Sequence, residues 1–232
     1  MAKKSVGGVT MTFFANFKKS ALELKNLRTL CVTAILIALD LALKTFVNVQ
    51  ITEDLKLNFA FIAVAAIGML YGPTVAGMAC LITDLLGYFL KPTGSFSPLF
   101  TIIEMTGGVI YGCFLYGFSP VRLEFGSGKE FGKSLLDNWQ PVLRIVLAKV
   151  AVAAVCNLVM TPFAITIQKV FEAGVYNADV FWVGLWTRIN TRLIKNAIEV
   201  PVHIVILMFA LFPIKAAYDS VFGRNKLYGG GT

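Results

Sequence analysis

Six apolar segments constrain the fold of this chain more than any other feature of its sequence. Each is long or apolar enough to cross a hydrocarbon core of about 30 Å as a helix. The segments span residues 30–47, 59–71, 74–90, 99–118, 142–170 and 187–212. The second is short and joins the third through "YGPTV", a Gly-Pro pair that is typical of a tight turn, so these two segments are predicted to form a helical hairpin.

The composition supports the bilayer as the solvent of these helices. Hydrophobic residues make up 57% of the chain and charged residues 15%, whereas a soluble domain carries about half apolar and about a quarter charged residues. We therefore predict an all-α integral membrane protein with a bundle of six transmembrane helices. The net charge of +8 does not indicate a nucleic-acid partner, because the basic residues form no single face with interleaved aromatics.

The distribution of Lys and Arg predicts the orientation. Six lie in the N-terminal arm, four between residues 119 and 144, and three in the C-terminal tail. By the positive-inside rule, both termini should be cytoplasmic, with outer connections at 48–58, 91–98 and 171–186. The chain 1–232 reads as a single membrane domain, with an interfacial arm (1–28), the six-helix bundle (29–212) and a cytoplasmic tail (213–232).

Catalytic signatures are missing from the sequence. It contains no P-loop, no HExxH and no GxSxG, so nothing indicates an enzyme or a cofactor of its own. The four cysteines are isolated and lie in or beside apolar segments, which predicts buried thiols and no metal site. His203, in the last apolar segment, is interpreted as a packing residue.

Ionisable residues inside the spans are the candidates for function, because such residues are costly in lipid and usually face a cavity or the protein interior. In the last segment, one helical face carries Arg188, Arg192, Lys195 and Glu199. The alternative is a structural ladder in which Lys195 pairs with Glu199 and nothing more.

A second polar stripe belongs to the third segment, where Asp84, Tyr88 and Lys91 share one helical face. Glu104 in the fourth segment lies at a similar depth, and Asn157 in the fifth lies nearer the middle. The outer half of the bundle is thus polar and the inner half largely apolar, which predicts a pocket open to the outside.

The first segment contains "TLCVTAILIALDLALK", in which Ala34, Ala38 and Ala42 recur every fourth residue. Small residues at this spacing allow another helix to approach closely. Asp40 and Lys44, spaced i, i+4, fall on the opposite face and form a predicted ion pair. Because the charged face must point into the protein, the alanine face is predicted to point outward, towards lipid or a partner protein.

These motifs resemble a known family. "ELKNLRTLCVTAILIALDLALK", with its AxxxAxxxA, is similar to the first helix of the substrate-binding S components of energy-coupling factor (ECF) vitamin transporters. "NFAFIAVAAIGMLYGPTVAGMACLITDLLGYFLKPTGSFSPLFTIIEMTGGVIYG" resembles the next three helices and "RINTRLIKNAIEVPVHIVIL" the last. The resemblance covers more than half of the chain and is strongest to the folate-specific branch, although "FSPLFT" departs from the loop expected there.

The resemblance implies a six-helix protein of the bacterial cell membrane that captures a vitamin at its outer face and is not itself an ATPase. It implies docking on a transmembrane scaffold subunit, with ATP hydrolysed by two further partner subunits. The family uses the alanine face of the first helix for docking, which here means Ala34, Ala38 and Ala42.

Folate as the ligand would give the polar residues defined roles. A carboxylate would accept two parallel hydrogen bonds from the pterin ring, with Asp84 as first candidate and Glu104 as second, and Asn157 could read another edge. Aromatic side chains would stack on the ring; the candidates are Tyr88, Phe96, Trp182 and Trp186. Basic side chains would bind the glutamate carboxylates; the candidates are Lys91, Arg188, Arg192 and Lys195.

Two alternatives remain open at this point. Another vitamin, such as pantothenate, would keep the family but leave the acidic and aromatic stripes without a role. An intramembrane enzyme or a structural subunit would instead depend on Glu199 or His203 and not on Asp84. A self-sufficient secondary carrier is disfavoured, because such carriers often show inverted repeats and this sequence shows none.

Overall fold

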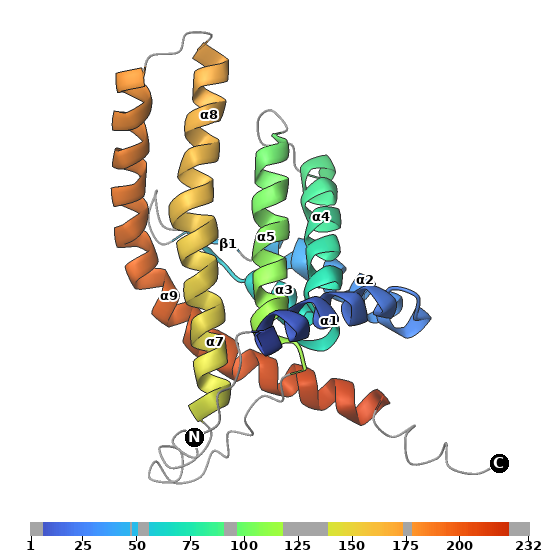
Figure 1. Ribbon diagram of the computed structural model, residues 1–232. Coiled ribbons are helices and arrows are strands. Elements are labelled where there is room, and N and C mark those ends of the chain that lie inside the picture. Colours follow the sequence, from blue (N-terminus) through green and yellow to red (C-terminus); the bar gives the residue numbers. More distant parts are fainter. Residues whose placement is uncertain are drawn as a thin grey trace, which may run out of the picture.

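The computed structural model describes residues 7–46, 48–50, 56–90, 97–117, 139–173 and 178–222. Its elements form an elongated helical assembly (Figure 1). In chain order they are α1 (Gly7–Glu23), α2 (Leu27–Phe46), β1 (Asn48–Gln50), β2 (Lys56–Asn58), α3 (Phe61–Tyr71), α4 (Pro73–Leu90), α5 (Pro98–Leu115), α7 (Trp139–Val152), the π-helical segment η1 (Ala153–Met160), α8 (Thr161–Ala173) and α9 (Ala178–Phe222).

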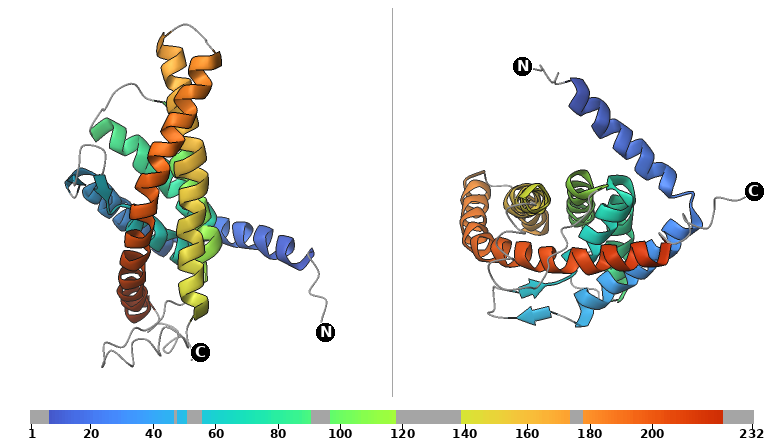
Figure 2. Two further views of the ribbon diagram at one scale, coloured as in Figure 1. Left: turned by 90° about the vertical axis from the view of Figure 1, so that its left-hand side faces the viewer. Right: turned by 90° about the horizontal axis from the view of Figure 1, so that it is seen from below.

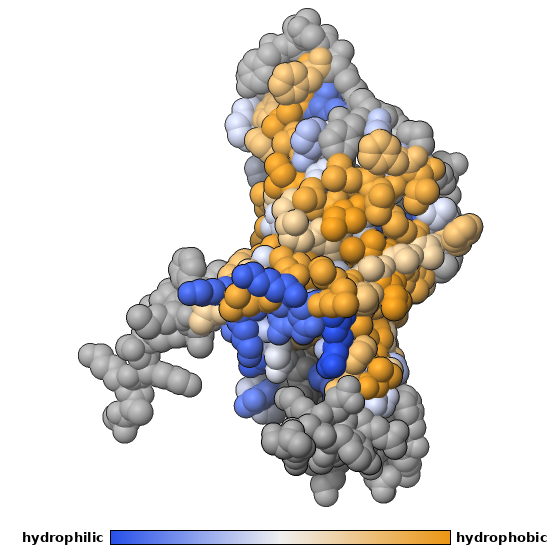
Figure 3. All heavy atoms as spheres, turned by 90° about the vertical axis from the view of Figure 1, so that its right-hand side faces the viewer, coloured by the Kyte–Doolittle hydropathy of each residue, from blue (hydrophilic) through white to orange (hydrophobic). Residues whose placement is uncertain are grey.

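Five helical stretches within the described residues are long and apolar enough to cross a membrane, which agrees with a multi-pass membrane protein. They are Leu27–Phe46, Pro73–Leu90, Pro98–Leu115, Val142–Phe171 and Phe181–Phe222. The outer surface matches this role. Apolar residues cover most of the face in Figure 3, and hydrophilic residues gather along α1 and its junction with α2.

Helix α3 forms the centre of the bundle. It has only 11 residues, which span roughly 16 Å at 1.5 Å per residue, about half of a hydrocarbon core. Eight of these residues are buried, among them Ala63, Ala65 and Ala66 at 0% exposure. A helix that is apolar on every side is expected to be enclosed, and α3 packs against α2, α4, α5 and α9.

Glycines allow the central helices to approach closely. A Cβ on Gly68 of α3 would lie 2.8 Å from the backbone nitrogen of Gly112 in α5. A Cβ on Gly112 would in turn overlap the backbone of Pro73, the first residue of α4. Gly108, one turn earlier in α5, packs against the Ala76 carbonyl of α4. The spacing of Gly108 and Gly112 is the small-xxx-small pattern of membrane helix contacts.

The hydroxyl of Ser20 fastens α1 to the turn between α3 and α4. It donates a hydrogen bond of 2.7 Å to the Tyr71 carbonyl. It also accepts hydrogen bonds from the Thr74 and Val75 backbone N–H groups at 3.1 and 3.2 Å. These N–H groups belong to the first turn of α4, where a helix leaves its donors unsatisfied. Ser20 is fully buried, so one side chain satisfies three backbone groups at this turn.

We expect Ser20→Ala to destabilise the folded protein by about 1–3 kcal/mol, because two backbone N–H donors and one carbonyl at this turn lose their partner. The measurement is thermal unfolding in detergent together with hydrogen exchange at Thr74 and Val75, which should accelerate. Ser220→Ala, which removes an exposed hydroxyl near the end of α9, is the matched control. Unchanged exchange in Ser20→Ala would contradict the capping role.

The last two spans are longer than the sequence predicted. Helix α9 is continuous over 45 residues, so residues 178–186, expected in an outer connection, and 213–222, expected in the tail, are helical. Pro201 and Pro213 lie inside α9, and the helix changes direction and crosses beneath the other helices (Figure 2, right). The predicted boundaries were wrong because they followed changes in polarity, whereas a membrane helix tolerates proline and continues past the apolar region when neighbouring helices support it.

The predicted fifth span 142–170 lies within α7, η1 and α8, which follow one another without a break. The connection 48–58, expected as a loop, contains a two-stranded sheet. Its strands β1 and β2 are antiparallel, with Asn48 opposite Asn58 and Gln50 opposite Lys56. The cytoplasmic placement of the two termini and the crossing of the membrane by α3 remain predictions.

Candidate ligand-binding cavity

A cavity of about 210 Å³ lies between α2, α3, α5, α7, η1 and α9. We call it the central cavity. Apolar and small residues form most of its wall, and a few charged or polar side chains project from different helices, as in many small-molecule sites. Its lining comprises Asp40, Lys44, Ala60, Phe61, Val64, Ile103, Glu104, Gly107, Gly108, Tyr111, Lys149, Val152, Cys156, Asn157 and His203.

One wall of the central cavity carries a three-residue ion-pair cluster. The Lys44 ammonium lies 3.0 Å from the Asp40 carboxylate, as the i, i+4 spacing predicted, and 3.6 Å from the Glu104 carboxylate of α5. The Asp40 side chain is 1% exposed, whereas that of Glu104 is 44% exposed. Asp40 therefore anchors Lys44, and Glu104 keeps an accessible carboxylate that can accept hydrogen bonds from a ligand.

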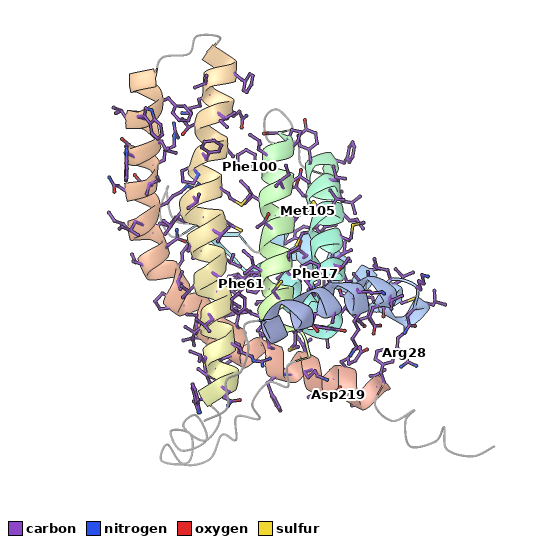
Figure 4. The ribbon with its side chains drawn as sticks, viewed as in Figure 1. Phe17, Arg28, Phe61, Phe100, Met105 and Asp219 are labelled. Atoms are coloured by element: carbon purple, nitrogen blue, oxygen red, sulfur yellow. The ribbon has the colours of Figure 1, made fainter. Side chains whose placement is uncertain are left out.

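Another part of the wall brings Lys149, Phe61 and His203 together. The His203 and Phe61 rings lie 4.2 Å apart between centroids, and the Lys149 ammonium lies 4.9 Å from the centroid of the Phe61 ring. Figure 4 labels Phe61 in the region where α5 and α7 face each other. None of the three was predicted to bind a ligand. A lone lysine inside an apolar span was the available signal for Lys149.

The π-helical segment η1 contributes Cys156 and Asn157 to the cavity. The Asn157 side-chain amide donates a hydrogen bond of 2.9 Å to the Asn196 side chain of α9. Asn196 in turn donates to the Arg192 carbonyl at 2.9 Å. Since π-helical turns change which side chains face a neighbour and often occur at functional sites, η1 explains how Asn157 reaches both the cavity and α9.

The other ligand candidates among the described residues do not belong to the lining of the central cavity. The Asp84 carboxylate accepts a hydrogen bond of 2.5 Å from Thr101 and so links α4 to α5. Tyr88 packs beside Phe89, and Lys195 pairs with Glu199 at 3.5 Å. Trp182 and Trp186 are 56% and 62% exposed. Lys91 and Phe96 lie outside the described residues.

The two basic residues at the start of the polar stripe on α9 are half-buried. Arg188 and Arg192 lie one turn apart, towards the α8–α9 end of the molecule and away from His203. The Arg188 Nε is buried without a hydrogen-bond partner among the described residues. These guanidinium groups are therefore able to bind an anionic group, although neither belongs to the lining of the central cavity.

Helix α2 has two different faces. Ala34 and Ala38 are exposed and Ala42 is half-buried, whereas Thr33, Leu36 and Asp40 are buried. The alanine face thus points away from the bundle, as its spacing predicted. Among the described residues, no group of three or more His, Cys, Asp or Glu side chains is arranged to hold a metal ion.

The chain is similar to proteins of one transporter family. The folate transporter FolT of Clostridium novyi (strain NT) is 29% identical over 184 residues, which cover 79% of this chain and 88% of the relative. The folate transporter FolT of Streptococcus mutans is 26% identical over 197 residues, which cover 85% of this chain and 90% of the relative.

The chain is also similar in fold to a solved structure. The crystal structure of FolT bound with folic acid superposes with a TM-score of 0.56 at 26% sequence identity, and the match covers 79% of this chain and 92% of that one. The family model of the substrate-specific component of ECF transporters matches residues 28–207. Most of the described helical assembly lies within this range, and the chain therefore belongs to the family of substrate-specific components of ECF transporters.

Proposed function

We propose that this protein captures folate in its central cavity and delivers it across the bacterial cell membrane as the S component of an ATP-driven importer. The observation that carries the proposal is the accessible Glu104 carboxylate in a cavity between the helices, in a chain whose relatives are named folate transporters. The neighbouring structure with bound folic acid supports the same ligand.

The polar groups of the cavity suit the pterin head of folate. Its amino group and adjacent ring N–H can donate two parallel hydrogen bonds to one carboxylate. The proposal assigns this role to Glu104, the second candidate from the sequence. Asp84, the first candidate, already accepts a hydrogen bond from Thr101 and is not part of the lining. Asn157 is the second polar group that the sequence predicted and that lines this cavity.

The size of the cavity indicates which part of folate it holds. Its volume of about 210 Å³ is below the range of about 300–1,000 Å³ of pockets that enclose a whole drug-sized ligand. The ring system would occupy the central cavity, and the glutamate tail would extend along α9. Arg188 and Arg192 would then bind the tail carboxylates, for which guanidinium groups are well suited.

Delivery would use the exposed alanine face of α2. Ala34, Ala38 and Ala42 form a smooth surface against which a helix of the transmembrane scaffold subunit can pack. The scaffold and two ATPase subunits are expected as partners on the basis of the family. ATP would be hydrolysed by these subunits, and the chain itself would need no cofactor.

The test of the proposal is calorimetric titration of the detergent-purified protein with folate, pantothenate, thiamine and riboflavin. Tight binding of folate alone, without nucleotide or partner subunits, is the expected result. Binding of a different vitamin would be consistent with the family but would show that folate is not the ligand. If none of the four bound, the proposed capture function would be rejected.

Glu104→Gln is expected to weaken folate binding by about tenfold or more, because hydrogen bonds to a charged group contribute about 1.5–3 kcal/mol. Asp84→Asn should have a smaller effect, since Asp84 faces Thr101. The two variants change the same functional group on neighbouring helices, so each is the matched control for the other. A larger loss of folate affinity in Asp84→Asn than in Glu104→Gln would show that Asp84, and not Glu104, binds the pterin.

A further inference from the structure

Lys149 is the least compensated basic side chain around the central cavity. It is only 5% exposed and lines the cavity from α7. Ion pairs within 4.0 Å among the described residues use Lys44, Lys195 and Lys215, and none involves Lys149. Glu199 attracts Lys149 from a greater distance, but its carboxylate pairs with Lys195 at 3.5 Å. A buried ammonium in a membrane helix is costly unless it meets a partner.

His203 also carries buried polar atoms that lack hydrogen-bond partners among the described residues. Both of its ring nitrogens are buried and have no hydrogen-bond partner among the described residues. Its ring is 6% exposed and stacks against Phe61, whose ring also contacts the Lys149 ammonium. Phe61 thus holds two side chains with hydrogen-bonding capacity against one side of the cavity. A buried polar group without a partner is unusual in a folded protein and calls for an explanation.

On the basis of the proposed folate function, we propose that Lys149 and His203 form a subsite for the hydrogen-bond acceptors of the pterin ring. Lys149 donates to the ring carbonyl oxygen or the neighbouring ring nitrogen, and His203 donates to an acceptor beside it. Glu104 accepts from the amino group and N–H of the adjacent edge. Together the two walls fix the orientation of a fused ring that presents adjacent donor and acceptor edges.

The position of the subsite distinguishes the ring from the tail of the ligand. Arg192 and His203 are separated by 11 positions on α9, which corresponds to roughly 16 Å along the helix. An extended ligand with its carboxylates at Arg188 and Arg192 therefore brings its other end to Lys149 and His203. Lys149 then binds the pterin ring and not the glutamate, whereas its positive charge alone would predict binding to a glutamate carboxylate.

The experiment compares Lys149→Met with the wild-type protein by calorimetry, using folate and pteroate. Pteroate retains the pterin and the aminobenzoate but lacks the glutamate. The expected result is a loss of about tenfold or more for both ligands, in the range of a hydrogen bond to a charged group. Unchanged affinity for both ligands would overturn the proposal. A loss for folate with no loss for pteroate would show that Lys149 binds a glutamate carboxylate, which also overturns it.

Two further variants separate a direct contact from effects of charge and folding. Lys169→Met removes the same charge from an exposed side chain of α8, in the helix that continues from α7, and should bind both ligands as the wild type does. His203→Phe keeps an aromatic ring against Phe61 but removes both nitrogens. It is expected to weaken both ligands and tests the subsite even if Lys149→Met fails to fold. Normal affinity for both ligands in His203→Phe would overturn the assignment of His203.

A failure of the subsite can be distinguished from a failure of the proposed function. If the wild-type protein binds neither folate nor pteroate, the ligand itself is wrong. If the wild type binds both and the Lys149 and His203 variants bind them equally well, folate capture stands and the subsite is wrong. Thermal unfolding of each ligand-free variant shows whether a loss of affinity reflects a loss of the folded state.

Discussion

Replacement of Ala38 by tryptophan is expected to abolish folate uptake and to leave folate binding by the purified protein unchanged. Ala38 is exposed in the middle of the alanine face of α2, and a large side chain there would keep a partner helix from approaching. The opposite face of the same helix carries the buried Asp40, so the new side chain does not reach the central cavity. The measurements are uptake by cells that contain the whole transporter and calorimetry on the isolated chain.

The size of the side chain is the variable under test in this experiment. Ala38→Ser keeps a small residue and should retain uptake, whereas Val205→Trp, at an exposed position of α9, should show that a surface tryptophan is tolerated elsewhere. Loss of folate binding in Ala38→Trp would contradict the outward placement of the alanine face. Normal uptake would exclude this face as the docking surface.

The second large effect is expected at Gly112, where even one methyl group should disrupt the bundle. A Cβ at this position would overlap the Pro73 backbone, and backbone atoms cannot move aside as a flexible side chain can. Overpacking of a well-packed core costs about 1–3 kcal/mol and sometimes more. Gly112→Ala is therefore expected to lower the unfolding temperature in detergent and to weaken ligand binding through the displacement of α5.

Gly184→Ala provides the matched control, because it makes the same change in another helix. A Cβ at Gly184 would meet no atom within 4 Å, and alanine favours a helix over glycine by about 1 kcal/mol. Gly184→Ala should thus leave the protein unchanged or slightly more stable. If both variants unfolded at the wild-type temperature, the close approach of α5 to the α3–α4 turn would not limit stability.

The sequence predicted the features that depend on spacing along a single helix. The i, i+4 separation of Asp40 and Lys44 predicted their ion pair, which the structure confirms at 3.0 Å. The same helical phase predicted that the alanines would lie opposite Asp40. The alternative pairing of Lys195 with Glu199 is also present, at 3.5 Å. Each follows from 3.6 residues per turn and needs no knowledge of the neighbouring helices.

The candidate site could be predicted only in part, because it depends on contacts between helices. Glu104 and Asn157 were predicted and line the central cavity. Asp84 was the first candidate for the pterin, yet its carboxylate contacts Thr101 of the neighbouring helix. The sequence places Asp84 at a position along its helix, but that position does not specify which neighbouring side chain Asp84 meets.

The helix boundaries could likewise be predicted only in part from the sequence. Polarity predicted where the spans lie, but α9 continues beyond both predicted ends, since tertiary contacts and not local composition decide whether a helix continues.

The amino-acid sequence alone was enough to predict a helical membrane protein, a small outward face on α2 and a relationship to the ECF S components. These properties follow from local hydrophobicity, from helical periodicity and from motifs. The meeting of Lys149, Phe61 and His203 at one cavity could be found only in the folded protein, because these residues come from α7, α3 and α9. No spacing along the chain relates three residues on different helices, and the packing of those helices alone brings their side chains together.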